Sequence, residues 1–269
     1  MNPYHKTNKL RWQKAAKKWG EMHDRRGTWK LAPAHPELVL GPQEMVWLNE
    51  VKNKQVCVRG SGDNLVVFPL AGLGAAVTSV DISETQLENA KRRARELKLD
   101  ITFQCADVSD LSMIAHETFD MVYTGGHVAV WEADLQQYYR EAIRVLRPGG
   151  LFIINEYHPF RRIWEDRSDR LSVRETYFNR GPHLFNVSEG LFEKRPGNIP
   201  SYEFYWTIAD YLNAVMETGA AILAFKEYGD EPEGFETAPT GGLPDHFLLV
   251  ARKDLAEQSN SRKNQKSSQ

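Results

Sequence analysis

Seven short apolar runs divide the chain, and most of the segments between them have the residue spacing of an amphipathic helix. The runs are VCV at 56, VTSV at 77, ITF at 101, FDMVY at 119, LFIIN at 151, AILAF at 221 and FLLVA at 247. Two of the intervening segments carry an apolar stripe: Leu87, Ala90, Ala94 and Leu97 in one, and Leu135, Tyr138, Ala142 and Leu146 in the other. Strands that alternate with helices predict an α/β fold, in which helices cover both faces of a mostly parallel sheet.

The segments outside this alternation are predicted to be appendages of one domain, because 269 residues with 41% hydrophobic side chains suit a single large core. Residues 1–50 carry aromatic side chains among many charges, and the helical spacing of Trp12 and Trp19 predicts an N-terminal helical cap. Residues 160–206 are rich in arginine and aromatic side chains, which predicts either a substrate-facing insertion with a small strand ribbon or an insertion with its own small core. Residues 256–269 are polar, so we expect a disordered tail.

Charge and hydropathy exclude several classes of function. A formal net charge of -2 provides no overall field that would attract nucleic acid or an anionic membrane. No stretch approaches the roughly 18 consecutive apolar residues that span a bilayer. Cys57 and Cys105 are the two cysteines, and their spacing suggests neither a disulfide framework nor a metal site, so we expect a reduced, cytoplasmic setting. The function must therefore be argued from a local site.

The stretch VCVRGSGDN, residues 56–64, places Gly60 and Gly62 directly after the first predicted strand. In an open parallel sheet ligands bind beyond the carboxyl ends of the strands, and glycine lets a ligand approach the backbone closely. The glycines alone are equally consistent with a structural turn. Asp81, however, ends the second strand and can accept both hydroxyl protons of a ribose, while Asp107 follows the third strand and can accept a hydrogen bond from an adenine amino group. Three loops are thus predicted to meet at one nucleoside-sized crevice.

Five stretches in order, VCVRGSGDN, VTSVDIS, ITFQCADVSDL, FDMVYTGG and LRPGGLFIINE, resemble the motifs of the class I S-adenosylmethionine-dependent methyltransferases. The resemblance covers residues 51–255 and closes with AILAFKEYGD and HFLLVARK, which resemble the final hairpin of that family. It implies a Rossmann-like sheet of seven strands in the order 3-2-1-4-5-7-6, with strand 7 antiparallel to the others. It also implies S-adenosylmethionine as the cofactor and residues 51–255 as the methyltransferase domain.

Carried over by position, the resemblance implies which residues would contact the methionine and ribose parts of the cofactor. Gly60, Ser61 and Gly62 would pass under the methionine moiety, and Thr124 would lie near it. Asp81 would hold the ribose hydroxyls.

The same correspondence places the adenine. Ile82 would pack on the adenine ring, and Asp107 together with the Val108 amide would bind its edge. Departures from the family pattern stand at Val58, where an acidic residue is usual, and at Asn64, where a third glycine is usual.

Pro69 falls within the first helix of the motif order and removes a backbone donor there. We therefore expect that helix to be short, late or kinked.

The loops after the fourth and fifth strands supply candidates for catalysis and for binding of the methyl acceptor. A sulfonium cofactor already activates its methyl group, so the protein mainly aligns and desolvates the reactants, and a base is needed only where the acceptor must lose a proton. His127 and His158 are the candidate proton acceptors; alternatively, His127 caps a helix and His158 turns the chain before Pro159. The candidate substrate-binding residues are Trp131, Glu156, Tyr157 and Arg161.

The sequence predicts an enzyme that methylates an oxygen, nitrogen or carbon atom of a small-molecule acceptor. The alternative is a catalytically inactive regulator or partner subunit that binds S-adenosylmethionine, which Val58, Asn64 and Pro69 would favour. An RNA methyltransferase is disfavoured because the chain has no basic stripe, although the arginine and aromatic content of residues 160–206 keeps that reading open. A nicotinamide-dependent reductase is disfavoured because the third glycine is missing.

Overall fold

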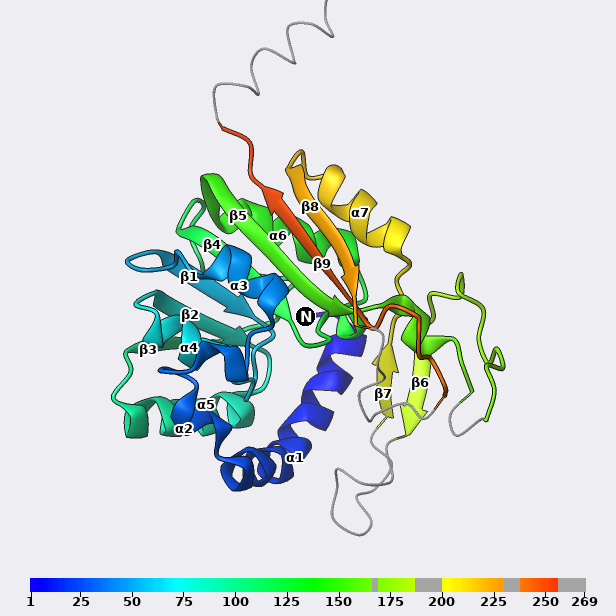
Figure 1. Cartoon of the computed structure of the whole chain (residues 1–269), viewed down its shortest axis with the longest axis horizontal. Coiled ribbons are helices and arrows are strands. Elements are labelled where there is room, and N and C mark those ends of the chain that lie inside the picture. The colour runs from blue at the N-terminus through cyan, green and yellow to red at the C-terminus, as the bar shows by residue number, and fades with distance from the viewer. Residues whose placement is uncertain (166–168, 187–199, 230–237, 256–269) are drawn as a thin grey trace, which may run out of the picture.

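A seven-stranded sheet forms the centre of the computed structural model, which describes residues 1–165, 169–186, 200–229 and 238–255. Its strands are β1 (Gln55–Arg59), β2 (Ala76–Asp81), β3 (Ile101–Cys105), β4 (Phe119–Gly125), β5 (Leu146–Tyr157), β8 (Ala221–Tyr228) and β9 (His246–Arg252). They follow the order β3-β2-β1-β4-β5-β9-β8, and β9 is antiparallel to both of its neighbours (Figure 1). The predicted order and the reversal of the seventh strand are confirmed, and each of the seven apolar runs lies in a strand. The predicted tail at 256–269 lies outside the described residues.

Helices cover both faces of the sheet, as predicted. Their bounds are α4 (Val67–Gly72), α5 (Glu84–Leu97), α6 (Leu135–Val145) and α7 (Ile208–Met216). Successive side chains of a strand point to opposite faces, so Phe152 and Ile154 pack with α6 and α7 on one side while Ile153 packs with α4 and α5 on the other. The inner strands β1, β4 and β9 are therefore buried on both faces, which explains their continuous apolar runs, whereas the edge strands β3 and β8 are partly exposed.

Two proline-containing stretches, around Pro69 and at RPGG, differ in secondary structure. α4 is only six residues long, which confirms the expectation of a short helix around Pro69. Pro69 is its third residue, where the missing N–H has no intrahelical partner to lose. The other stretch, RPGG at 147–150, follows the predicted helical stripe that ends at Leu146, but β5 already begins at Leu146 and continues through RPGG. Leu146 is fully buried as predicted, yet its backbone is extended because it pairs with Phe119 of β4.

The N-terminal segment is helical along most of its length. It comprises α1 (Pro3–Arg26), α2 (Thr28–Leu31), the 3-10 helix η1 (Pro36–Leu38) and α3 (Pro42–Leu48). The fully buried Arg93 of α5 fixes the far end of α1, because its guanidinium donates to the Asp24 carboxylate at 3.0 Å and to the Gly20 carbonyl at 2.9 Å. α1 therefore lies beyond the strand ends and reaches from α5 to the segment around residue 200 (Figure 1).

Residues 160–206 contain the ribbon that the sequence suggested, although residues 166–168 and 187–199 lie outside the described part of the chain. Strands β6 (His183–Asn186) and β7 (Pro200–Glu203) pair antiparallel as a separate two-stranded sheet. Asn8 of α1 fixes β7 through two hydrogen bonds with the Tyr202 backbone, one accepted at 2.8 Å and one donated at 2.9 Å. Short 3-10 helices, η2 (Ala129–Trp131) and η3 (Pro159–Arg162), follow β4 and β5. No helix among the described residues has both the length and the apolar character needed to cross a bilayer.

Candidate functional site

A cavity of about 760 Å³ opens at the carboxyl ends of the strands, where ligands of open α/β sheets bind. We distinguish two halves by their lining residues. The glycine half comprises Gly60, Ser61, Gly62, Asp81, Ile82, Val108 and Glu132, and the arginine half comprises Arg11, Trp12, His127, Trp131, Tyr157, Arg161, Arg162 and Glu203. The first half is built mainly from the loops after β1, β2 and β3, and the second from α1, β7 and the loops after β4 and β5.

The loop after β1 contains two glycines at positions where a side chain would be unfavourable. Gly60 and Gly62 both have left-handed backbones, with φ of 65° and 48°. A Cβ atom on Gly60 would lie 2.4 Å from a methyl carbon of Val128, so the loop after β1 touches the loop after β4 at this point. The Ser61 hydroxyl bonds the Ser79 hydroxyl of β2 at 2.5 Å. Both glycines are therefore required by the backbone, and Gly60 is also required by packing.

Asp81 ends β2 at the floor of the glycine half, as predicted. Its carboxylate accepts the Ser83 N–H at 2.8 Å, which orients it at the start of α5. Burial raises its pKa to about 6, against the opposing effect of the backbone N–H groups of Ser83 and Gly62. Ile82 follows it and lines the cavity half-buried, so an apolar surface and a carboxylate lie side by side.

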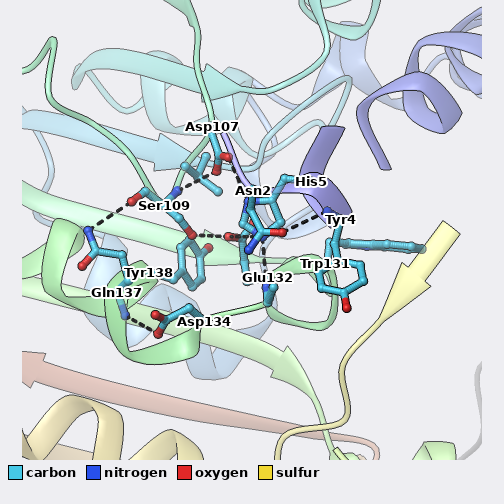
Figure 2. Close-up of polar contacts among 12 residues, drawn as sticks. Asn2, Tyr4, His5, Asp107, Ser109, Trp131, Glu132, Asp134, Gln137 and Tyr138 are labelled. Carbon is cyan, nitrogen blue, oxygen red and sulfur yellow. Dashed lines mark hydrogen bonds and ion pairs between the residues drawn. The ribbon is translucent and has the colours of Figure 1, made fainter. Parts of the chain in front are cut away.

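The Asp107 carboxylate is hydrogen-bonded to a histidine that no sequence pattern indicated (Figure 2). His5 of α1 places Nδ1 2.8 Å from the Asp107 carboxylate, while its Nε2 accepts the Ala133 N–H at 3.0 Å. Because a backbone N–H can only donate, the imidazole proton is on Nδ1 and is donated to Asp107. Asp107 is not among the described residues that line the cavity, although its neighbour Val108 is.

Burial and neighbouring charges act in opposite directions on the pKa values of this cluster. Burial lowers the pKa of His5, but the hydrogen bond that it donates to Asp107 and the charges of Glu132 and Asp107 outweigh this effect, so the pKa is raised. Burial raises the pKa of Glu132. One ligand atom from each of His5, Asp107 and Glu132 lies within 4.8 Å of the others, a spacing that a metal ion could bridge. Both imidazole nitrogens already make hydrogen bonds, so the trio is satisfied as an internal network.

Thr124 and Glu156, two of the predicted site residues, are not among the described residues that line the cavity. The Thr124 hydroxyl bonds the Tyr138 hydroxyl at 2.5 Å within the core. Glu156 is fully buried, and its Oε1 accepts the N–H groups of Val128 and Ala129, each at 3.2 Å. Burial raises the pKa of Glu156 to about 8. Glu156 thus supports the turn after β4 from below.

The two candidate histidines are in different environments. His158 is buried outside the cavity lining, where Nδ1 accepts the Phe160 N–H at 3.2 Å and Nε2 lies 2.8 Å from Glu227. This geometry matches the alternative that His158 turns the chain before Pro159. His127 lines the cavity with a left-handed backbone, φ 76°.

The His127 ring has a defined tautomer. Its Nε2 bonds the Arg162 guanidinium, which can only donate, so the proton of the neutral ring is on Nδ1. Burial and the charges of Arg162 and Arg161 hold the pKa of His127 well below its usual value.

Aromatic rings and guanidinium groups alternate along the arginine half. The Arg11 guanidinium lies 4.4 Å from the Trp131 ring centre, and the Arg161 guanidinium lies 4.2 Å from that of Tyr157. Tyr157 also contacts His127, with 4.8 Å between ring centres. The structure thus brings Trp131, Tyr157 and Arg161 together as predicted. Arg11 had no signal in the sequence beyond its place beside Trp12 on a predicted helix.

Comparison with known proteins finds similarity to methyltransferases. Residues 58–154 match the family model described as a methyltransferase domain. Over 124 residues the chain is 31% identical to the ubiquinone biosynthesis O-methyltransferase of Coxiella burnetii. The aligned stretch covers 45% of this chain and 51% of that protein. The chain thus spans about half the length of the curated relatives it matches.

Solved structures show the same fold. An S-adenosylmethionine-dependent methyltransferase from Mesorhizobium loti superposes with a TM-score of 0.60 at 22% identity, over 79% of this chain and 99% of that one. Magnesium protoporphyrin IX methyltransferase from Synechocystis superposes with a TM-score of 0.58 at 14% identity, over 94% of this chain and 99% of that one. At these identities the likeness extends to the fold alone.

Proposed function

We propose that this chain, which carries a class I S-adenosylmethionine-dependent methyltransferase domain, transfers the cofactor's methyl group to a small-molecule acceptor. The observation that carries the proposal is the glycine half of the cavity. Gly60 and Gly62 hold left-handed backbones beside the Asp81 carboxylate, and Ile82 and Val108 line the same space. This combination suits a nucleoside with two ribose hydroxyls and a flat base.

The residues present fit S-adenosylmethionine. Asp81 would accept the ribose hydroxyl protons, and Ile82 with the Val108 amide would hold the adenine. Gly60, Ser61 and Gly62 would pass beside the methionine moiety. Asp107 and Thr124, which the family resemblance also assigns to the cofactor, would act through their neighbours, because their polar groups already bond His5 and Tyr138.

The cofactor supplies an activated methyl group, so the chain's own contribution is alignment and exclusion of water. Trp131, Tyr157 and Arg161 would position the acceptor, with Glu156 supporting the turn that carries His127. Of the two histidines proposed as proton acceptors, His127 lines the cavity and His158 does not. The Arg162 bond and the lowered pKa make His127 a weak base, which favours catalysis by alignment.

The remaining parts of the proposal concern setting and organisation. We assign residues 1–50 as a helical cap, 51–255 as the methyltransferase domain, and about 160–206 as its substrate-facing insertion. The sequence has no basic stripe, which favours a metabolite over RNA, and the two free cysteines favour a cytoplasmic setting. The inactive-regulator alternative would be favoured by a cavity blocked at Phe68 or Pro69. Both are buried in α4, and neither is among the described lining residues.

Calorimetric titration with S-adenosylmethionine tests the proposal. We expect wild-type protein to bind it, Asp81→Ala to bind it at least about tenfold more weakly because two charge-assisted hydrogen bonds are lost, and neither NADH nor NADPH to bind. Equal affinity in wild type and Asp81→Ala would remove Asp81 from the site. Absence of binding to a folded wild-type protein would overturn the proposed cofactor.

A further inference from the structure

Arg11 of α1 is a buried cation without a polar partner. It is 8% exposed and lines the cavity, and its Nη1 is buried without a hydrogen bond. Within the described residues it makes no hydrogen bond or ion pair, and its guanidinium lies instead over the rings of Trp12 and Trp131. Burial lowers its pKa only to about 10, so it stays charged at neutral pH. A buried charge without hydrogen bonds is unfavourable for folding, which marks Arg11 as a binding group.

His127 presents a second unused donor in the same half of the cavity. Its Nε2 is taken by Arg162, so Nδ1 carries the proton, and this nitrogen is buried without a hydrogen-bond partner. The left-handed backbone of His127 is an uncommon conformation for a side chain of this size, and such conformations concentrate at functional sites. Two N–H donors from distant parts of the chain therefore remain unsatisfied at one cavity wall.

The charge of the surroundings decides what these donors bind. Arg11, Arg161 and Arg162 line this half of the cavity, and Glu203 is the one carboxylate among its lining residues as we defined them. Arg162 lies 3.7 Å from Glu203 and Arg161 lies 3.8 Å from Asp245, so two of these three cations are offset and the charge of Arg11 remains. Positive charge next to unused N–H donors favours an oxyanion over a neutral or cationic group.

We propose that the methyl acceptor carries a carboxylate, which Arg11 and the Nδ1–H of His127 bind. The flanking rings of Trp12, Trp131 and Tyr157 suit a flat apolar body attached to that carboxylate. The inference rests on the proposed methyltransferase function. The methionine moiety of the cofactor also ends in a carboxylate, and the experiment separates these two sources.

The test uses full-length protein saturated with S-adenosylhomocysteine, benzoate as the carboxylate probe and benzamide as its neutral counterpart, followed by calorimetry. We expect benzoate to bind wild-type protein, benzamide not to bind, and Arg11→Gln and His127→Ala each to weaken benzoate binding about tenfold or more. Arg25→Gln is the matched control, because it removes the same charge from an exposed position on the same helix. Binding of benzoate and benzamide with equal affinity, absence of benzoate binding, or equal loss in Arg25→Gln would overturn the inference.

Two further measurements keep the outcomes distinct. If Arg11→Gln weakens binding of S-adenosylmethionine itself about tenfold, Arg11 binds the cofactor's carboxylate and the inference about the acceptor is overturned. Thermal unfolding without ligand separates a binding role from a structural one: we expect Arg11→Met to unfold at the wild-type temperature or above, and a clear decrease would assign Arg11 to stability. Loss of S-adenosylmethionine binding in the wild type would instead overturn the proposed function.

Discussion

The two halves of the cavity differ in how the chain builds them and in what they offer a ligand. The glycine half follows the strand ends in chain order, and its polar groups are carboxylates and backbone amides. The arginine half joins α1, β7 and the loops after β4 and β5, and its polar groups are mainly guanidinium and imidazole donors. The shape of the glycine half depends on the sheet, because consecutive strand ends form it. The shape of the arginine half can change with each of the distant segments that form it. The first suits a shared cofactor and the second an individual acceptor.

The largest expected effect concerns the support beneath the arginine half. The Glu156 carboxyl is neutral in the folded protein up to its pKa of about 8, whereas in the unfolded chain it ionises near its ordinary pKa of 4.5. The stability that this group contributes is therefore complete below 4.5 and lost as the pH rises to about 8. We expect Glu156→Gln to exceed wild type in free energy of unfolding at pH 8.5 by on the order of 4 kcal/mol and to match it near pH 4.5.

Urea unfolding at both pH values measures this difference, and Glu117→Gln, on the surface, is the control. A constant difference between Glu156→Gln and wild type at all pH values would mean that Glu156 is ionised in the folded state. The turn that carries His127 would then rest on a buried charge.

The next effect tests whether the halves are joined at Gly60. An alanine there must take a left-handed backbone and also meet Val128 at 2.4 Å, so we expect a loss of about 3 kcal/mol in the free energy of unfolding. Gly27 has nearly the same φ, 68°, and open space around it, so Gly27→Ala isolates the backbone effect of about 1 kcal/mol. Similar losses in both variants would show that the contact with Val128 relaxes freely and that the halves are independent.

A smaller effect separates the halves by pH. Binding of ribose hydroxyls requires ionised Asp81, whose pKa of about 6 predicts that affinity for S-adenosylmethionine falls about tenfold between pH 7.5 and pH 5. Asp81→Asn should bind weakly with little dependence on pH over the same range. Calorimetric titration across the range measures both, and a wild-type affinity that is constant with pH would contradict the assignment of Asp81 as the titrating group.

The smallest effect concerns the contact of α1 with the glycine half. The raised pKa of His5 means that its stabilising contribution is complete below pH 6.5 and is lost as the pH rises through the folded-state value. Relative to His5→Gln, the wild type should therefore lose unfolding free energy as the pH rises above 6.5. His116→Gln, on the surface, is the control, and parallel pH profiles for His5→Gln and wild type would show that the bond to Asp107 does not change with protonation.

The sequence predicts the sheet and the glycine half well, because both depend on local patterns. Apolar runs mark the strands, Gly60 and Gly62 lie in the loop that follows β1, and Asp81 ends β2. Leu146 is the exception: its burial fits a helical stripe, but pairing with β4 draws it into β5. Tertiary contact overrides local periodicity there.

The sequence predicts less of the arginine half and of the cluster at Asp107. His5 is 102 residues from Asp107, and no local pattern relates the two. In the sequence, only the neighbouring Trp12 distinguishes Arg11 from the other arginines of its helix. Thr124 and Glu156 stand at the expected strand ends, but hydrogen bonds to Tyr138 and to the turn after β4 take them into the core.

The anchoring of α1 at both ends has a consequence for protein engineering. Arg93 fixes one end of the helix through Asp24, and Asp107 fixes the other through His5. A chimera that exchanged α1 alone would remove Asp24 from the buried Arg93 guanidinium, which would keep only Asp63 among the described carboxylates, and would remove His5 from the buried Asp107 carboxylate. The helix should therefore be exchanged together with its two distant partners, Arg93 and Asp107.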